Sequence, residues 1–564
     1  MLDWVWGHPR AKRRAREVWG ASRWLARRLH LSWLGEPPEF RDLRRLARSA
    51  APPPKTGERV LILSFRGWST HVALEAVIGH AVAQSGWTPV FATCGGRLPV
   101  CDVMPVHAAP PMPCRSCAEY AGGAIAAAGH ELTRLNEMID FPAATRLARE
   151  QVAGLRSVSE CERFTIDGLA IGEMVRTSVA WFLARGTLDE RPSVLDAYRA
   201  FLVSGIVLAQ AFDRLLARTR PRRIFALNGR FFAERILLEI ARRQGIGFTT
   251  YEKGFRPGTV VTAPEGFASD LLIPEAEVSA ALERKLSPAE DRRLEAYLQG
   301  RRRDSGGLDR LWTRPLEEAV AVRRLLGLEA SRPLVAMFCN ILWDSAVVGK
   351  DLGFPSMGEW VRQGVAWAGR HPDIDLVVRL HPAEVRLTNH RSLERMGSFI
   401  REVAPVLPPN VRIISAESHV SSYTLMDLTR VGLVYTSSVG LEMAAQGVPV
   451  VVAGETHYRG RGFTVDPTSV AAYWEAVESL LATGPPRSER DLLRQRARRY
   501  AYHFFFRHHR QITSVREEGR SRPRVVVRTA AALGPGLDRD LDAVVSDVLG
   551  LGEAAPVPLE GAAP

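Results

Sequence analysis

The stretch that decides the fold is Val434-Tyr435-Thr436-Ser437-Ser438-Val439-Gly440-Leu441-Glu442, followed by Gly447-Val448-Pro449-Val450-Val451-Val452. An apolar run breaks at small hydroxyl residues and a glycine, a helical pattern follows, and a second apolar run comes next. This pattern predicts a strand, a tight turn and a helix whose first backbone N–H groups are left open. Together with the helix dipole, these N–H groups form an anion site, and Ser437 and Ser438 add hydroxyl donors to it.

The same alternation of strands and helices runs through two long regions of the chain. The first begins with the strand 60–65, directly after the proline-rich linker 51–54, and the second begins with the strand 333–338. Such alternation is typical of parallel sheets whose ligands bind at the carboxyl ends of the strands. The turn 66–71 lacks the repeated glycines of a dinucleotide fingerprint, so an NAD-binding role is not expected. We predict an α/β fold with two Rossmann-like domains.

Chain length and charge divide the sequence further. A chain of 564 residues exceeds what one hydrophobic core usually serves. The net charge of +13 lies mainly at the two ends: residues 1–50 hold 12 Lys and Arg against 5 Asp and Glu, and residues 484–530 hold 13 against 4. A core that binds nucleic acid would carry its own basic face, so the nearly neutral centre argues against a nucleic-acid partner. The predicted segments are a basic, tryptophan-rich helical extension at 1–50, a Rossmann-like domain with a cysteine cluster and a helical insertion at 51–325, a second Rossmann-like domain at 326–483, and Arg-rich helices with a disordered tail at 484–564.

The first 35 residues combine arginines with the tryptophans Trp4, Trp6, Trp19, Trp24 and Trp33. A helix of this composition can lie on an anionic membrane surface, or it can pack on the main body with its arginines in water; both interpretations stay open. No apolar run approaches the roughly 20 residues that span a bilayer. The N-terminus also lacks the apolar core of a secretory signal. We therefore expect a cytoplasmic protein, either free or peripheral on the inner face of the membrane.

Polar side chains follow the predicted strands at four places. The opening stretch supplies the first, with Thr436, Ser437, Ser438 and Gly440. One turn further, Glu442 can accept hydrogen bonds from the hydroxyls of a nucleotide ribose. The second is Arg379-Leu380-His381-Pro382-Ala383-Glu384, where the proline holds His381 extended at the mouth of the sheet. Each has a simpler interpretation, namely a helix cap with a solvated Glu442 and a structural His381.

The other two places come from different halves of the chain. Glu252 ends an apolar strand beside Gly254, whose lack of a side chain allows close approach, so Glu252 is a candidate general base. Asn340 and Asp344, with Lys350 beyond them, follow the strand 333–338. A surface ion pair or simple packing would explain any one of these places. Because all four follow strands, in two domains, their pattern favours a functional site.

These motifs resemble the capsule polysaccharide biosynthesis family, the group that includes Kdo transferases of capsules and lipid anchors. The matching pieces cover most of residues 333–466 in the family's order: Asn340…Trp343-Asp344, Arg379 to Glu384, Tyr435 to Glu442, and Gly454…Tyr458-Arg459-Gly460…Gly462-Phe463-Thr464. The first half matches less, mainly at Asn228-Gly229-Arg230 and Glu252-Lys253-Gly254. The resemblance implies a GT-B glycosyltransferase, with two Rossmann-like domains facing a cleft, helical extensions at both ends, and no catalytic metal.

The resemblance also implies a role for each motif. Glu252 would deprotonate the acceptor hydroxyl, and His381 would stabilise the departing nucleotide phosphate. The donor-binding residues would be Asn340, Lys350, Arg379, Glu384, Thr436, Ser437, Ser438, Gly440 and Glu442. Lys253 replaces the second acidic residue of the family's motif, which leaves Asp344 and Glu384 as rivals for the base. The implied partners are a nucleotide-sugar donor, held by the second domain, and a glycan or glycolipid acceptor, held by the first.

Two other classes of function stay open. A polyol-phosphate transferase or a nucleotide-sugar epimerase can use the same architecture. A membrane-attached scaffold of a polysaccharide assembly complex would instead use the basic ends of the chain and carry out no catalysis. We disfavour the scaffold because the polar groups at the strand ends are numerous and match the family.

Four of the 6 cysteines cluster within 24 residues, at Cys94, Cys101, Cys114 and Cys117. In a reducing cytoplasm, clustered thiols more often bind a metal than form disulfides. Four thiolates suit a tetrahedral structural zinc, which would pin a long loop. An iron–sulfur cluster is a less favoured occupant, and unligated thiols in a loop are the simplest alternative.

Overall fold

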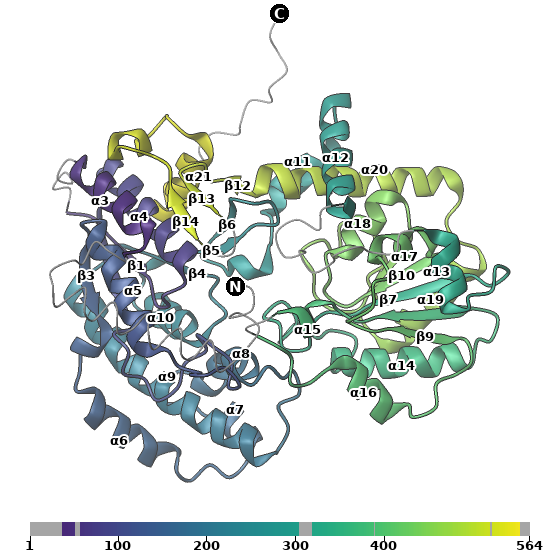
Figure 1. Cartoon of the computed structure of the whole chain (residues 1–564), viewed down its shortest axis with the longest axis horizontal. Coiled ribbons are helices and arrows are strands. Elements are labelled where there is room, and N and C mark those ends of the chain that lie inside the picture. The colour runs from purple at the N-terminus through teal and green to yellow at the C-terminus, as the bar shows by residue number, and fades with distance from the viewer. Residues whose placement is uncertain (1–35, 51–56, 304–317, 388–389, 519–521, 553–564) are drawn as a thin grey trace, which may run out of the picture.

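Two large sheets, one mostly parallel and one entirely parallel, form the framework of the described part of the chain (Figure 1). The computed structural model describes residues 36–50, 57–303, 318–387, 390–518 and 522–552. The predicted membrane-surface segment 1–35 lies outside the described residues, and so do residues 553–564 of the disordered end predicted from about residue 551. Each sheet is covered by helices on both faces, and apolar side chains from strands and helices meet there in hydrophobic cores.

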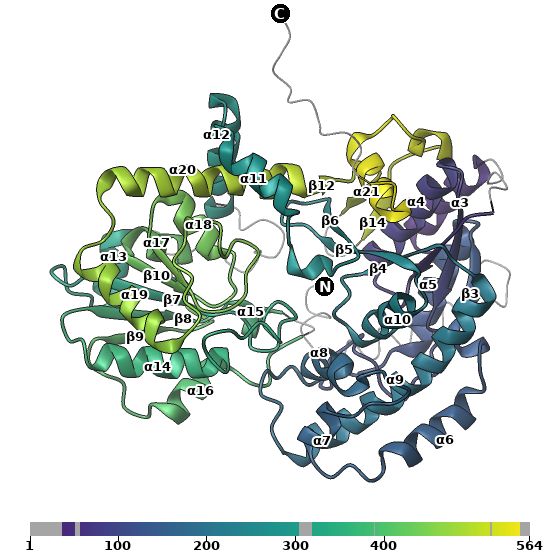
Figure 2. The same cartoon turned by 180° about the vertical axis from the view of Figure 1, so that it is seen from behind.

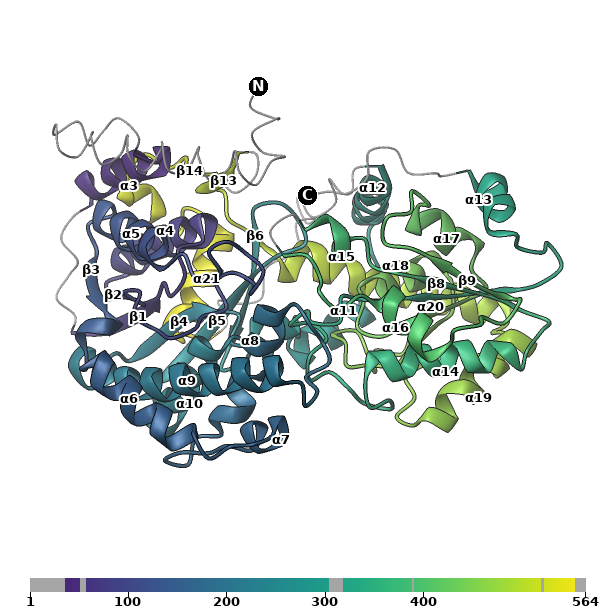
Figure 3. The ribbon, with the colours of Figure 1, turned by 60° about the horizontal axis from the view of Figure 1, so that its bottom comes forward.

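The first sheet has the strand order β12-β6-β5-β4-β1-β2-β3. Its main strands are β1 Arg59–Leu63, β2 Thr88–Thr93, β3 Glu131–Arg134, β4 Arg223–Leu227, β5 Gly247–Lys253 and β6 Thr259–Pro264. The strands from β3 to β5 are parallel, and β6 runs antiparallel to β5. Strand β1 lies in the middle and is buried on both faces because its residues 60–63 are all apolar. Helices α4 (Ser69–Gln84) and α5 (Cys114–Ala127) cover one face, and α9 (Pro192–Thr219) and α10 (Phe232–Arg243) cover the other (Figure 3).

The second sheet is parallel throughout, with the order β11-β10-β7-β8-β9. Its strands are β7 Leu334–Phe338, β8 Asp375–Arg379, β9 Val411–Ile414, β10 Val431–Val434 and β11 Val450–Val452. In both sheets the first strand lies between the second and the fourth. After the third strand, the chain returns to the other side of the first strand. The edge beside the first strand is therefore the topological switch point, where doubly wound sheets bind ligands.

The remaining helices surround these sheets. In the first half of the chain they are α3 Pro38–Arg48, α6 Phe141–Val152, α7 Val158–Glu162, α8 Ile171–Leu183, α11 Glu275–Glu283 and α12 Pro288–Arg303. In the second half they are α13 Ala319–Leu326, α14 Met357–Gly369, α15 Ala383–Arg386, α16 Met396–Val403, α17 Ser422–Leu428, α18 Val439–Gln446, α19 Val470–Ala482, α20 Arg487–His503 and α21 Arg539–Leu549.

The C-terminal part of the chain returns to the first domain, which corrects the predicted separate segment at 484–564. Helix α20 runs along the second domain toward β12, as Figure 2 shows. Strand β12 (Arg510–Gln511) then adds to the edge of the first sheet beside β6. The hairpin of β13 (Val515–Glu517) and β14 (Pro523–Val525) and helix α21 follow, and their apolar residues enter the core that contains α4. Their arginines stay at the surface, which is why charge alone suggested an extension.

The boundary predicted between residues 325 and 326 also moves. The apolar residues of α11 and α12 pack in the core of the second domain with β7 and α18, so this domain begins near residue 273. Helix α9 is the one described helix that is long and apolar enough to cross a membrane by length and composition. Within its apolar 18-residue window, 72% is buried inside the protein, as expected for a core helix.

Candidate active site

The loops after β7 and β10 meet at the point where the strand order of the second sheet reverses. Asn340, just beyond β7, accepts a hydrogen bond from the backbone N–H of Thr436, just beyond β10, at 3.3 Å. The two strands are neighbours in register, with Phe338 opposite Val434. The sequence places these polar residues at strand ends, and the parallel pairing brings them together at the expected ligand-binding edge.

The turn after β10 has the strand, turn and helix arrangement that the sequence predicts. Helix α18 begins at Val439, and the Ser438 side chain makes no capping hydrogen bond. The Ser437 hydroxyl accepts from the Val439 N–H at 3.3 Å. Among the described residues, the buried Thr436 hydroxyl has no hydrogen-bond partner. The first N–H groups of α18, which the sequence predicts to be open, instead bond to Ser437 and Ser438. The Thr436 hydroxyl is the donor that this turn can offer to an anion.

Gly440 contributes to this turn through packing. A Cβ at this position would come within 2.3 Å of the Tyr458 hydroxyl oxygen. The Tyr458 hydroxyl in turn donates to the backbone oxygen of Ser437 at 2.6 Å. The glycine therefore lets Tyr458 hold the turn in place, and Tyr458 is a residue of the last motif in the family resemblance.

His381 follows β8 as a neutral ring with a defined tautomer. Its Nδ1 accepts a hydrogen bond from the Ala383 N–H at 3.2 Å, so in the neutral ring the hydrogen must be on Nε2. Burial, with a contribution from Arg379, lowers the pKa of His381 to about 4. At neutral pH the ring is thus an uncharged hydrogen-bond donor through Nε2.

Arg379 and Glu384 lie in the framework under this loop. Arg379 donates to the Ser415 backbone oxygen at 2.7 Å and to the Ser422 hydroxyl at 3.2 Å. Glu384 accepts from the Met396 N–H at 3.0 Å, at the start of α16, and burial raises its pKa to about 7. Both side chains are buried and hold neighbouring loops.

Glu442 is buried, unlike the solvated side chain of the simpler interpretation. Its carboxylate lies 3.1 Å from the guanidinium of Arg301, on α12. That guanidinium lies 5.7 Å from the ring centre of Phe255 and 5.8 Å from that of Tyr297. Phe255 comes from the first domain, so the ribose-binding candidate lies where the two domains meet.

Lys350 links the domains directly. Its Nζ lies 2.9 Å from Asp270 of the first domain and 3.2 Å from Glu455, which follows β11. Asp270 also pairs with Arg230. Lys350 therefore joins the two edges of the interdomain surface, and it is only 6% exposed.

Glu252 and Asp344 are carboxylates from different domains that influence each other. The Glu252 oxygens accept from Asn228 Nδ2 at 3.1 Å and from the Lys253 N–H at 2.9 Å. Burial raises the pKa of Glu252, and the negative charge of Asp344 adds to the rise. Asp344 accepts from the Ala346 N–H at 3.0 Å, and burial raises its pKa as well. The structure thus brings Glu252, the predicted general base, and Asp344, the alternative base, toward one region.

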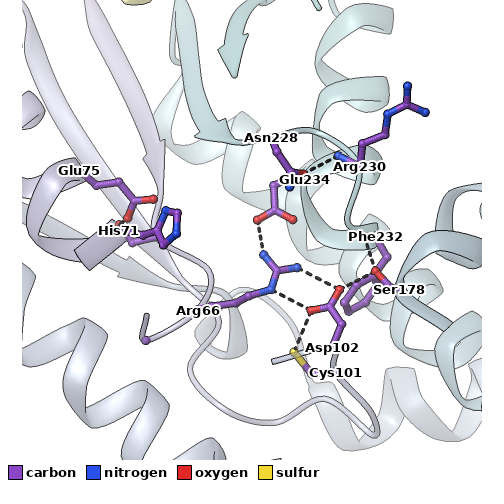
Figure 4. A network of polar contacts seen from close by, with 12 residues as sticks. Arg66, His71, Glu75, Cys101, Asp102, Ser178, Asn228, Arg230, Phe232 and Glu234 are labelled. Atoms are coloured by element: carbon purple, nitrogen blue, oxygen red, sulfur yellow. Dashed lines mark hydrogen bonds and ion pairs between the residues drawn. The ribbon is translucent and has the colours of Figure 1, made fainter. Parts of the chain in front are cut away.

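A buried ion network beneath the first-domain edge was missed by the sequence reasoning (Figure 4). Arg66, directly after β1, donates to Asp102 at 2.8 Å and to Glu234 at 2.6 Å. Ser178 donates to Asp102 and accepts from the Phe232 N–H at 2.9 Å. The sequence signal for this network is a charged residue, Arg66, directly after a buried strand. The partners of Arg66 come from distant segments, so the sequence could not show that its charge is neutralised.

The four clustered cysteines line one small cavity beside this network. Cys117 accepts from the Gly67 N–H at 3.0 Å, and Cys101 lies beside Asp102. Burial raises the pKa of each thiol, that of Cys94 to about 12. In the described part of the chain, no group of three or more His, Cys, Asp or Glu side chains is arranged to hold a metal ion. Zinc binding here would have to displace thiol protons.

Comparison with known proteins gives structural similarities only. No family model matches the sequence, and no curated protein matches it. KpsC β-Kdo 2,7-transferase of Thermosulfurimonas dismutans is 18% identical, covering 51% of this chain and 80% of that chain with a TM-score of 0.30. UDP-GlcNAc 2-epimerase of Neisseria meningitidis is 11% identical, covering 78% and 95% with a TM-score of 0.26. Sucrose-phosphate synthase of Thermosynechococcus elongatus is 15% identical, covering 79% and 95% with a TM-score of 0.29.

The described fold is α/β, with two Rossmann-like sheets in one chain and helical segments flanking both domains. Two KpsC enzymes of Thermosulfurimonas dismutans, with TM-scores of 0.30 and 0.31, are among these similar structures.

Proposed function

We propose that this chain is a metal-independent glycosyltransferase that transfers a sugar from a nucleotide donor to a glycan or glycolipid of the cell surface. The observation that carries the proposal is the contrast between the two domains. The second domain offers neutral donors at its ligand edge: the Nε2–H of His381 and the hydroxyl of Thr436, which is unpartnered among the described residues. The first domain offers the carboxylate of Glu252, whose pKa is raised by burial.

These groups match the charges that sugar transfer generates. The acceptor oxygen bonds to the anomeric carbon while the bond from that carbon to the phosphate oxygen breaks, and the hydroxyl proton passes to Glu252. A base works best when its pKa is close to the working pH, so the raised pKa of Glu252 favours it over an ordinary surface carboxylate. The departing phosphate would receive hydrogen bonds from His381 and from the turn with Ser437 and Ser438.

The nucleotide would bind beside this turn, with Glu442 on the ribose hydroxyls. In the structure Glu442 pairs with Arg301, so nucleotide binding would share or replace that contact. Lys350 already bridges the domains and would hold them together around the donor. On this proposal the protein works in the cytoplasm, and residues 1–35 bring it to an anionic membrane where a glycolipid acceptor would be found.

A nucleotide screen tests the donor half of the proposal. We expect CMP, UDP or GDP to raise the melting temperature of the full chain, because a ligand that binds only the native state stabilises it. The corresponding sugar nucleotide should then release its nucleotide faster when an acceptor is added. No stabilisation by any nucleotide would contradict the proposal. Conversion of the donor sugar without an acceptor would instead indicate an epimerase on the same fold.

A further inference from the structure

We propose that His71 positions the acceptor: its Nε2 accepts a hydrogen bond from a hydroxyl of the sugar that is to be glycosylated. This inference rests on the proposed function and deepens it, because it adds an acceptor-binding group to the first domain. His71 lies outside the four polar strand ends that the sequence predicts to be functional. It lies in the first turn of α4, after β1, at the carboxyl edge of the first sheet, where β5 also ends, with Glu252 as its penultimate residue.

A chain of hydrogen bonds fixes which nitrogen of His71 carries the hydrogen. The Nδ1 atom lies 3.2 Å from the Tyr251 hydroxyl oxygen. Tyr251 donates its hydroxyl to one oxygen of Glu75 at 2.6 Å, and Ser64 donates to the other at 2.5 Å. When Glu75 is ionised, its two oxygens can only accept, so Tyr251 gives its single hydrogen to Glu75. The Tyr251 oxygen can therefore only accept from His71, so the hydrogen is on Nδ1 and Nε2 keeps a lone pair.

The Nε2 atom is available to a ligand. Within the described residues no hydrogen bond reaches it, and the ring is half-buried, whereas Tyr251 and Glu75 behind it are buried. Figure 4 shows His71 and Glu75 to one side of the Arg66 network. Burial, followed by the charges of Lys253 and Arg66, lowers the pKa of His71 to about 3. The ring is then neutral and too weakly basic to take a proton, so it suits hydrogen bonding and leaves proton transfer to Glu252.

The surroundings of His71 indicate a sugar. The half-buried Trp68 lies at the start of α4, and its ring centre is 5.7 Å from that of His71. A sugar ring has a face of C–H groups and a rim of hydroxyls. An aromatic face beside a single fixed hydrogen-bond acceptor is complementary to both. Arg66, under Trp68, is neutralised by its own carboxylate partners, so the subsite does not depend on a charged ligand.

Two substitutions distinguish the roles of the two nitrogens of the His71 ring. The amide of His71→Asn reaches the position of Nδ1 and can still donate to Tyr251, but it leaves nothing at Nε2. The amide of His71→Gln reaches the position of Nε2 and loses the contact with Tyr251. A positioning role predicts that Asn is the more harmful change for acceptor binding. A structural role, in which His71 only supports Tyr251, predicts that Gln is the more harmful change.

The test uses the full chain and three simple probes: methyl α-D-glucopyranoside, methyl β-D-galactopyranoside and methyl α-D-mannopyranoside. Binding is followed by saturation-transfer NMR at pH 9, above the pKa of Glu75, which is about 8. We expect at least one glycoside to bind the wild type and His71→Asn to weaken it about three- to tenfold, as for the loss of one hydrogen bond, while His71→Gln stays closer to the wild type. The reverse order of the two variants, or no glycoside binding to the wild type, would overturn the proposal.

The nucleotide screen on the same variants keeps this inference separate from the proposed function. Both variants should be stabilised by the nucleotide as much as the wild type, because His71 lies on the first domain and the proposed donor site on the second. Normal nucleotide binding with glycoside binding unchanged in His71→Asn would refute the role of His71 alone. Absence of nucleotide binding in the wild type would refute the proposed function instead.

Discussion

Replacing Glu75 by Gln should change how the stability of the first domain depends on pH. The Glu75 side chain is 3% exposed, and burial raises its pKa from an ordinary 4.5 to about 8. Hydrogen bonds from Ser64 and Tyr251 and the charge of Arg66 act in the opposite direction, while Glu234 adds to the rise. Burial is the largest of these effects, so the folded protein holds this proton more tightly than the unfolded chain does.

The sign and size of the effect follow from that difference. Between pH 4.5 and 8 the folded state keeps a proton that the unfolded state has released, so the free energy of unfolding must fall as pH rises. The slope is at most about 1.4 kcal/mol per pH unit, and it levels off above the folded pKa. From pH 6 to pH 8 the loss comes to roughly 2 kcal/mol. Glutamine has no proton to release, so Glu75→Gln removes this part of the pH dependence.

Urea unfolding of the wild type and of Glu75→Gln, followed by tryptophan fluorescence, measures the effect at both pH values. Other titrating groups are common to the two proteins, so the difference between their free energies of unfolding isolates Glu75. We expect Glu75→Gln to gain roughly 2 kcal/mol on the wild type between pH 6 and pH 8. A constant difference across this range would show that Glu75 is ionised throughout, and the reasoning from burial would be refuted.

The remaining predictions concern catalysis and metal binding. His381→Ala should lower kcat about 10²- to 10³-fold, as the loss of a donor to the leaving group would, whereas the exposed His419→Ala should leave kcat unchanged; an equal effect of both would remove the role of His381. Glu252→Gln should abolish transfer but not nucleotide binding, and retained turnover would exclude it as the base. Asp344→Asn removes a negative charge that raises the pKa of Glu252, so the acidic limb of the pH profile of kcat/KM should move to lower pH. If that limb does not move, the charge of Asp344 does not act on Glu252. If the cysteine cluster binds structural zinc, elemental analysis should find zinc in the wild type and less in Cys114→Ser, and zinc-free wild type would end that prediction.

The sheet framework could be predicted because its signal is local. The apolar run 60–65 is observed as β1 Arg59–Leu63, and the run 333–338 as β7 Leu334–Phe338. Strand β12 (Arg510–Gln511) could not be predicted in the same way. It is a two-residue strand, and it exists only because β6, more than 240 positions earlier, offers it an edge. Apolar patterns reveal continuous strands, but they carry no information on which distant edge a short segment will join.

In the candidate site, too, the positions of residues along the chain could be predicted, whereas their tertiary contacts could not. Asn340 and Thr436 could be placed together because parallel strands deliver their carboxyl ends to one edge. Motif position did not show that Arg379 donates to Ser415, because the partner of a long side chain at a strand end depends on tertiary contacts. His71 and Tyr251 are 180 positions apart, so their contact appears only in the folded chain.

The two histidines at the proposed site present opposite tautomers, and this limits where a pH dependence can arise. His381 presents a hydrogen on Nε2 to the donor side, and His71 presents a lone pair on Nε2 to the acceptor side. The pKa of each is lowered, to about 4 and about 3, so neither gains a charge near neutral pH. Glu75 titrates near pH 8, and its ionisation fixes the hydrogen of Tyr251 and thereby that of His71, so a change in transfer rate near that pH would come from this carboxylate. Burial also raises the pKa of Glu252. A profile that followed an ordinary histidine, which titrates near pH 6.5, would contradict this arrangement.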